Sequence, residues 1–269
     1  MRLMWHSGFE NRTQIYLILL IAERLYHNII RFIEKIRPIC VPFFLILLIA
    51  CNRTAAPADL PPQEIVARAA ARMAGLPGFR FAIDRSGAPA FVDPDQTISF
   101  GGAVGDYVAP DRARATMRVI LPGLVTELNV ISIGAVQWET NVATGQWDEL
   151  PPNWGFNPAV LFDQEVGLPT ILAEDLTEVT LVGTETVEGV GLYLLTGTVA
   201  GERPFRLSNG LIGPEPLEAQ LWVAPETFEL HRLVVTEATA GEAEPSVWQI
   251  EFSEFGRVVE IEPPVLERE

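Results

Sequence analysis

The sequence predicts an α+β fold, in which one long, strongly curved antiparallel β-sheet carries helices on its concave face. One segment near residue 65 has apolar residues at helical spacing, whereas many later segments alternate apolar and polar residues with a period of two. No alternating segment is uniformly apolar, which favours an antiparallel sheet with one covered face. Two short proline-led segments interrupt the strands, and no repeat or linker divides residues 61–269. These residues are therefore expected to form one domain.

The first expected element is a helix over Gln63–Ala74. Pro61 and Pro62 open it and Gly75 ends it, as is typical of helix termini. Its apolar positions follow the i, i+4, i+7 pattern, so one face is expected to be buried. These positions are Ile65, Val66, Ala69, Ala70 and Met73.

Strands are expected wherever the period becomes two. Phe79 and Ile83 share one face of the first strand, and Arg80 and Asp84 share the other. Turn signals such as Pro122-Gly123 separate the later runs. The expected strands cover 79–84, 117–121, 128–130, 136–141, 177–183, 191–200, 218–223, 231–236 and 247–252. Two short helices, Asn157–Phe162 and Leu168–Ala173, stand between the fourth and fifth of them, each with an early proline and leucines on one face.

A lipoprotein signal peptide is expected before this domain. Lys35 and Arg37 precede an apolar core, Ile39–Ala50, which has the length of a signal-peptide core and is too short to span a bilayer comfortably. Leu48-Ile49-Ala50-Cys51 resembles the bacterial lipobox, in which the peptidase cuts before the cysteine and the thiol carries diacylglycerol. The alternative is an ordinary cysteine buried in an apolar helix. Residues 1–50 are thus interpreted as an N-terminal extension plus signal peptide, and residues 51–60 as a lipidated tether.

The extension over residues 1–34 is longer than a lipoprotein signal requires. The simplest interpretation is that translation starts downstream of Met1, which predicts that residues such as Tyr16 and Leu25 do not pack against the domain. The rival interpretation is a transmembrane hairpin, but the apolar run Ile15–Ala22 has eight residues against the ~20 that a spanning helix needs.

Composition excludes several classes of function. The formal net charge is −16, and removing the six basic and three acidic residues of positions 1–50 from 19 and 35 leaves 13 against 32, or −19. Such a surface repels nucleic acid and anionic headgroups, so membrane attachment is expected to come from acyl chains. Cys40 lies before the cleavage point and Cys51 is used for lipidation, which leaves no internal disulfide and no cysteine-based zinc site.

Signals of an enzyme or a cofactor are missing. His231 is the one histidine after residue 50, and no GxSxG or HExxH motif occurs. Gly101–Gly105 is glycine-rich but lacks the Lys-Ser/Thr of a phosphate-binding loop. The adjacent Glu174 and Asp175 could act as an acid–base pair, although a solvated acidic face is the more ordinary interpretation. We expect no catalytic residue, metal site or cofactor.

Several segments resemble the LppX/LprAFG lipoprotein family across essentially the whole domain. They are Trp147–Leu161, Val166–Leu172, Gly183–Tyr193, Leu221–Thr227, Leu230–Val234 and Phe252–Pro264. Trp222 and Tyr193 are interpreted as core or register residues. Ala224 departs from the pattern, because the family's turn often has an acidic residue there.

The resemblance implies a fold similar to the LolA/LolB carriers, a strongly curved half-barrel whose space under the helices takes up acyl chains. The expected function is then a membrane-anchored lipoprotein on the extracytoplasmic face of the cell membrane, which binds and carries envelope lipids or glycolipids. An envelope lipid transporter would be a further partner. Two alternatives stay open: a sensor or structural module that acts through its surface on a membrane partner, and a hydrolase with cryptic carboxylates.

The expected cavity walls come from elements far apart in the sequence. The residues are Phe81, Ile83, Met117, Val119, Leu128, Val130, Leu161 and Leu172. The same side chains would face inward in a fully packed core, so the pattern alone leaves cavity and core open.

Overall fold

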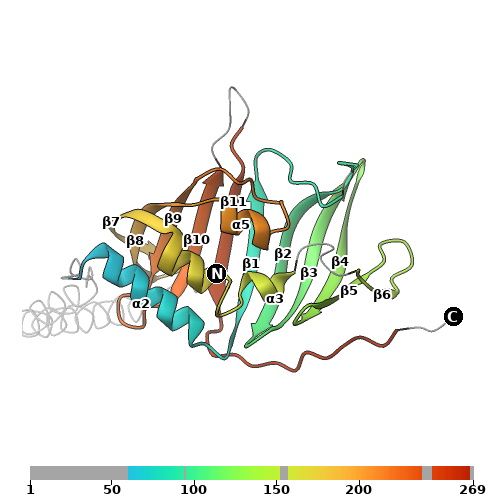
Figure 1. Ribbon diagram of the computed structural model, residues 1–269, viewed down its shortest axis with the longest axis horizontal. Coiled ribbons are helices and arrows are strands. Elements are labelled where there is room, and N and C mark those ends of the chain that lie inside the picture. Colours follow the sequence, from blue (N-terminus) through green and yellow to red (C-terminus); the bar gives the residue numbers. More distant parts are fainter. Residues whose placement is uncertain (1–59, 94, 152–156, 238–243, 267–269) are drawn as a thin grey trace, which may run out of the picture. The chain divides into compact units, whose positions relative to one another are not determined.

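A computed structural model of the chain describes residues 60–266, except 94, 152–156 and 238–243, and these residues fall in one compact unit (Figure 1). The predictions on the signal peptide, the translation start, Cys51 and the tether up to residue 59 lie outside the described residues.

The described unit is built on one eleven-stranded antiparallel sheet. Its order is β6-β5-β4-β3-β2-β1-β11-β10-β9-β8-β7, so the first and last strands in sequence meet at β1 and β11. The strands are β1 (Gly78–Ser86), β2 (Ser99–Val108), β3 (Arg112–Leu121), β4 (Leu124–Ile133), β5 (Val136–Thr140), β6 (Trp147–Glu149), β7 (Leu176–Val187), β8 (Val190–Val199), β9 (Leu217–Val223), β10 (Leu230–Glu237) and β11 (Val247–Ser253).

The predicted antiparallel sheet is confirmed, and two parts of the fold prediction are corrected. The domain is mostly β, because only short helices accompany the sheet. The sheet is open, with β6 and β7 as its two edges, and it is not strongly curled into a half-barrel. Alternation of apolar and polar residues determines which face of a strand is buried, but it carries no information on how far successive strands bend a sheet.

The helices lie together on one face of the sheet (Figure 1). They are α2 (Pro62–Ala74), α3 (Pro158–Leu161), α4 (Leu168–Thr170), the π-helical turn η1 (Ile171–Asp175) and α5 (Glu202–Leu207). The side chain of Asn157 caps α3 by accepting from the backbone N–H of Ala159 at 2.9 Å. α2 packs on α4, η1 and β7, whereas α3 packs on β3 and β4. The three predicted helical segments are confirmed, and α5 is additional.

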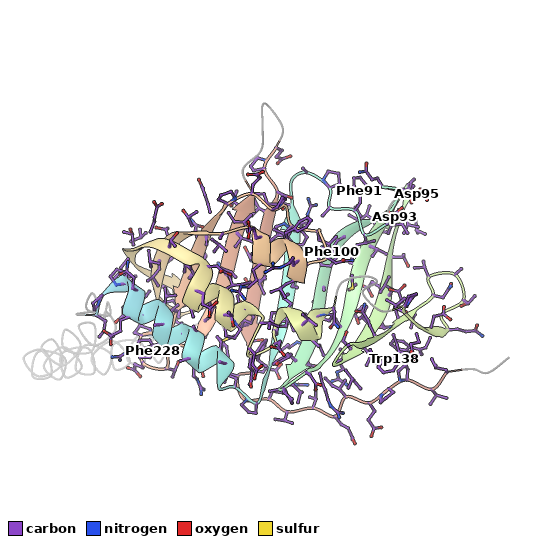
Figure 2. All side chains as sticks on the ribbon, viewed as in Figure 1. Phe91, Asp93, Asp95, Phe100, Trp138 and Phe228 are labelled. Atoms are coloured by element: carbon purple, nitrogen blue, oxygen red, sulfur yellow. The ribbon has the colours of Figure 1, made fainter. Side chains whose placement is uncertain are left out.

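The predicted α2 has the amphipathic character that the sequence indicates. Its five predicted apolar positions are all buried. Two arginines of its polar face contact residues 228 and 229. Arg72 donates to Glu229 at 2.6 Å, and the guanidinium of Arg68 lies 5.1 Å from the ring centre of Phe228 (Figure 2). These contacts join the start of the domain to the turn between β9 and β10.

Strand β2 was not predicted, because its glycines hide the alternation. Gly105 pairs with Phe81 on one side and with Ala115 on the other. A Cβ added at Gly105 would lie 2.2 Å from the carbonyl oxygen of Arg114 and 2.7 Å from the ring of Phe81. The absence of a side chain at Gly105 therefore leaves the space that the Phe81 ring occupies.

Candidate functional site

The helix-covered face brings together all eight residues predicted to line a cavity. β1 supplies two of them, β3 and β4 supply two each, and α3 and η1 supply one each. Each is buried and belongs to a single apolar cluster on this face. The relative exposures are Phe81 1%, Ile83 3%, Met117 6%, Val119 0%, Leu128 8%, Val130 1%, Leu161 9% and Leu172 2%. The alternation predicted that these side chains share one face, and they do. That a void lies between them stays a prediction.

An aromatic group at the centre of this face was not singled out from the sequence. The ring of Phe162, directly after α3, lies 4.7 Å from that of Phe81 and 5.3 Å from that of Phe79. Tyr107 and Phe252 surround the same ring at 5.9 Å each. Phe162 ends the predicted helix 157–162, but only the strand pairing brings the other four rings to it. It ties the short α3 to β1, β2 and β11.

The helix-covered face turns polar at its β5–β6 end. The register places Glu139 opposite Val130, Gln137 opposite Ser132 and Asp148 opposite Glu139, so all four polar side chains share the face of Val130. Ser132 is fully buried, and its Oγ has no hydrogen-bond partner among the residues that the structure describes. This polar rim was not predicted from the sequence. In β5 the apolar Trp138 lies on the uncovered face and the polar Gln137 and Glu139 on the covered one, the reverse of the usual pattern.

Burial raises the pKa of Glu139 above its ordinary value, and the Asp148 carboxylate raises it further. The folded protein therefore holds this proton at pH values where the unfolded chain has released it. The contribution of Glu139 to stability thus falls as pH rises from its unfolded pKa of about 4.5 through its raised folded pKa. Glu139→Gln is expected to remove this loss, and its free energy of unfolding should exceed that of the wild type more at pH ~7 than at pH ~4. Urea unfolding at both pH values measures the difference.

The matched control is Glu149→Gln, which neutralises an exposed carboxylate on β6 that points the other way. If the free energy of unfolding depends on pH equally in the wild type and in Glu139→Gln, the raised pKa of Glu139 is contradicted.

Three clefts lie on the face away from the helices. Their volumes are about 270, 420 and 280 Å³. Arg80 lines all three, Arg114 lines the first and Arg232 the second, and these side chains point away from the helices. This uncovered face thus carries clefts that combine arginines with apolar side chains, in contrast to the buried apolar face beneath the helices.

The same uncovered face carries a small apolar cluster of Leu192, Trp222 and Ala224. The indole N–H of Trp222 donates to Glu185 at 2.8 Å, and Arg232 lies 5.5 Å over its ring. Tyr193 points to the opposite face and joins the main core. Both residues are buried as predicted, but on different faces of the sheet.

The residues considered for chemistry are in structural contacts. Arg203 donates to Glu174 from Nη2 at 2.8 Å and to Asp175 from Nε at 2.5 Å. These two charge-assisted contacts join η1 to α5. Burial lowers the pKa of His231, whose ring packs on Phe255 at 5.0 Å. Among the described residues, no three His, Cys, Asp or Glu side chains are grouped to hold a metal ion. No helix in the described part of the chain is long and apolar enough to cross a membrane.

Comparison with known families decides the identity of this domain. The profile of the LppX_LprAFG lipoproteins matches residues 61–261. The chain belongs to the LppX/LprAFG lipoprotein family. The match covers the sheet and every described helix, and it ends at Ile261, whose backbone carbonyl accepts from Arg112 at 2.7 Å. The family is one of envelope lipoproteins, which implies a membrane-anchored location.

Solved structures agree on the fold. LprF from Mycobacterium bovis superposes with a TM-score of 0.59 at 16% identity, over 76% of this chain and 96% of that one. LppX from Mycobacterium tuberculosis gives 0.54 at 16% identity, over 76% and 100%. A LolA superfamily protein from Nitrosomonas europaea gives 0.25 at 12% identity, over 75% and 96%, a score too low to support an argument. A search of curated proteins finds no match.

Proposed function

We propose that this LppX/LprAFG lipoprotein binds and carries acylated envelope lipids or glycolipids beneath its helices. The observation that carries the proposal is the continuous apolar surface of the helix-covered face, which extends from Val130 on β4 through Phe81 to Leu195 on β8. The helices over it are one of thirteen residues and four segments of three to six residues. Short segments of this kind can separate from a sheet more easily than long packed helices.

The chemistry of such a surface suits acyl chains. A buried methylene contributes roughly 0.8 kcal/mol, so a chain inserted beneath the helices is held without polar contacts. The polar rim of Ser132, Gln137, Glu139 and Asp148 lies at one end of the same face. Hydroxyls of a glycolipid headgroup would give a hydrogen-bond partner to the Ser132 Oγ, which has none among the described residues. The eight predicted residues would then line the apolar part and the rim would face the headgroup.

The proposal includes the anchor. Cys51, acylated after cleavage of the signal peptide, would hold the domain at the extracytoplasmic face of the membrane, with residues 52–60 as the tether. A carried lipid would move between this membrane and a partner such as an envelope lipid transporter.

Native mass spectrometry of the full chain, purified from its bacterial host in neutral detergent, tests the proposal. We expect a mass above that of the acylated protein, which organic extraction assigns to a lipid with acyl chains. A protein that repeatedly purifies without lipid, and that takes up no fluorescent lipid from micelles, would contradict carriage.

The second candidate is a surface module that acts on a membrane partner and holds no lipid. The clefts and the Trp222 cluster on the uncovered sheet face favour it, because they are accessible without any movement of the helices. A lipid-free interior, together with loss of the protein's cellular effect when the uncovered face is altered, would select this function.

A further inference from the structure

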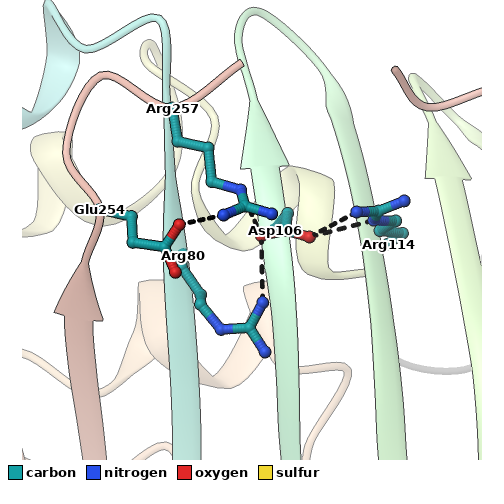
Figure 3. Close-up of polar contacts among 5 residues, drawn as sticks. All are labelled: Arg80, Asp106, Arg114, Glu254 and Arg257. Carbon is teal, nitrogen blue, oxygen red and sulfur yellow. Dashed lines mark hydrogen bonds and ion pairs between the residues drawn. The ribbon is translucent and has the colours of Figure 1, made fainter. Parts of the chain in front are cut away.

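The uncovered face carries a cluster of arginines around the buried carboxylate of Asp106 (Figure 3). The side chain of Asp106, on β2, is 5% exposed. Arg114 of β3 donates to its Oδ2 from Nε at 3.0 Å and from Nη2 at 2.9 Å. Arg80 of β1 and Arg257 of the C-terminal segment lie 3.5 and 3.4 Å from Oδ1. Three guanidinium groups from separate parts of the chain thus meet at one carboxylate.

The cluster holds more positive charge than Asp106 can balance. Arg257 also contacts Glu254, so three positive and two negative charges leave a local net charge of +1 in a chain whose net charge is −16. A single arginine would suffice to pair one buried carboxylate. Asp106 therefore acts as a support that holds the guanidinium groups in place, while their outer edges face solvent.

The arginines keep donors that no described residue uses. The Arg80 side chain makes no hydrogen bond to the described residues, and it is 39% exposed. Arg114 uses only Nε and Nη2 for Asp106, and it is 46% exposed. The planar guanidinium group presents paired N–H donors, a geometry that matches the oxygens of a phosphate group.

Both arginines open onto the cleft of about 270 Å³. Asn129 also lines it and accepts from the Thr116 hydroxyl through Oδ1 at 3.0 Å, which directs its amide N–H groups elsewhere. Val104, Ile131 and Trp147 form apolar walls beside these donors. The cleft thus combines cationic donors for an oxyanion with apolar surface for the group attached to it.

We propose that this cleft, on Arg80, Arg114 and Asn129, binds a phosphate group, either free or as part of a lipid or sugar-phosphate headgroup. The site is separate from the proposed lipid-carrying face, because β1–β3 present their Arg80, Asp106 and Arg114 side chains on the side opposite Phe81. Such a site would be a local exception to the expectation from net charge, because three arginines gather here in an acidic chain.

Isothermal titration of the full chain in neutral detergent micelles tests this site. Two probes are used: sodium phosphate, and the water-soluble phosphodiester glycerophosphoglycerol, each against sodium chloride of equal ionic strength. We expect saturable binding of a probe, weakened about tenfold or more in Arg80→Gln/Arg114→Gln because two charge-assisted donors are lost. Binding of both probes indicates a general phosphate site, whereas binding of the phosphodiester alone indicates a headgroup site.

The matched control is Arg68→Gln/Arg72→Gln, which removes the same charge from α2 and should leave the affinity within about twofold. Arg80→Gln alone serves if the double variant does not fold, since Arg80 makes no hydrogen bond to the described residues, and it should still weaken binding about threefold. The proposal is overturned if the wild type binds neither probe beyond the chloride control. It is equally overturned if Arg80→Gln keeps the wild-type affinity. Lipid co-purification with the same variants reports separately on the proposed carrier function.

Discussion

The full chain with Cys51→Ser, expressed in a bacterium, is expected to carry no diacylglycerol and to stay uncleaved between Ala50 and Cys51. Only a thiol at this position accepts the diacylglyceryl group, and in the lipobox pathway the peptidase acts on the modified cysteine. Metabolic labelling with palmitate and the mass of the membrane-extracted protein measure both effects, which should be complete.

Cys40→Ser is the matched control for this result. The same substitution eleven residues earlier falls in the expected signal peptide. It should therefore leave palmitate labelling and the mature mass unchanged. Palmitate that still labels the Cys51→Ser protein would show that another residue is the anchor.

The largest expected effect on the proposed function is that of Val119→Trp, which should abolish uptake of a fluorescent lipid. Val119 is fully buried on β3, opposite Phe100 and Thr126, and belongs to the apolar cluster beneath the helices. An indole would occupy the space that an acyl chain needs. If that space exists, the free energy of unfolding should fall by only about 1–3 kcal/mol or less, because the ring enters a void. A lipid-binding titration and urea unfolding of the same protein measure the two effects.

Val125→Trp is the matched control for Val119→Trp. Val125 lies on the adjacent β4 but is 59% exposed and pairs with Ile120, on the other face of the sheet. The same enlargement there should leave lipid uptake unchanged. Unfolding of Val119→Trp, combined with a wild type that binds no lipid, would mean a closed core and would favour the surface module.

Local patterns predicted much of this fold. The helix ended by Gly75 and the strands of Phe81 and Val119 form where proline, glycine and alternation indicate. The pattern failed where glycine replaced the inward side chain, as at Gly105 in β2. β5 forms where it was predicted, but its covered face is polar at Gln137 and Glu139, which the pattern did not indicate. In both places the tertiary neighbours, and not the local propensity, account for the residue type.

The sequence by itself determined the family, the expected acylation signal and which side chains of β1, β3 and β4 turn toward the helices. These follow from order, composition and a period of two, all of which are local. Only the tertiary structure decided that β1 lies between β2 and β11, and hence that Arg80, Arg114 and Arg257 meet at the carboxylate of Asp106. Strand pairing joins residues as far apart in the sequence as Arg80 and Ser253. No local pattern records such a pairing, because it depends on the free energy of the whole sheet.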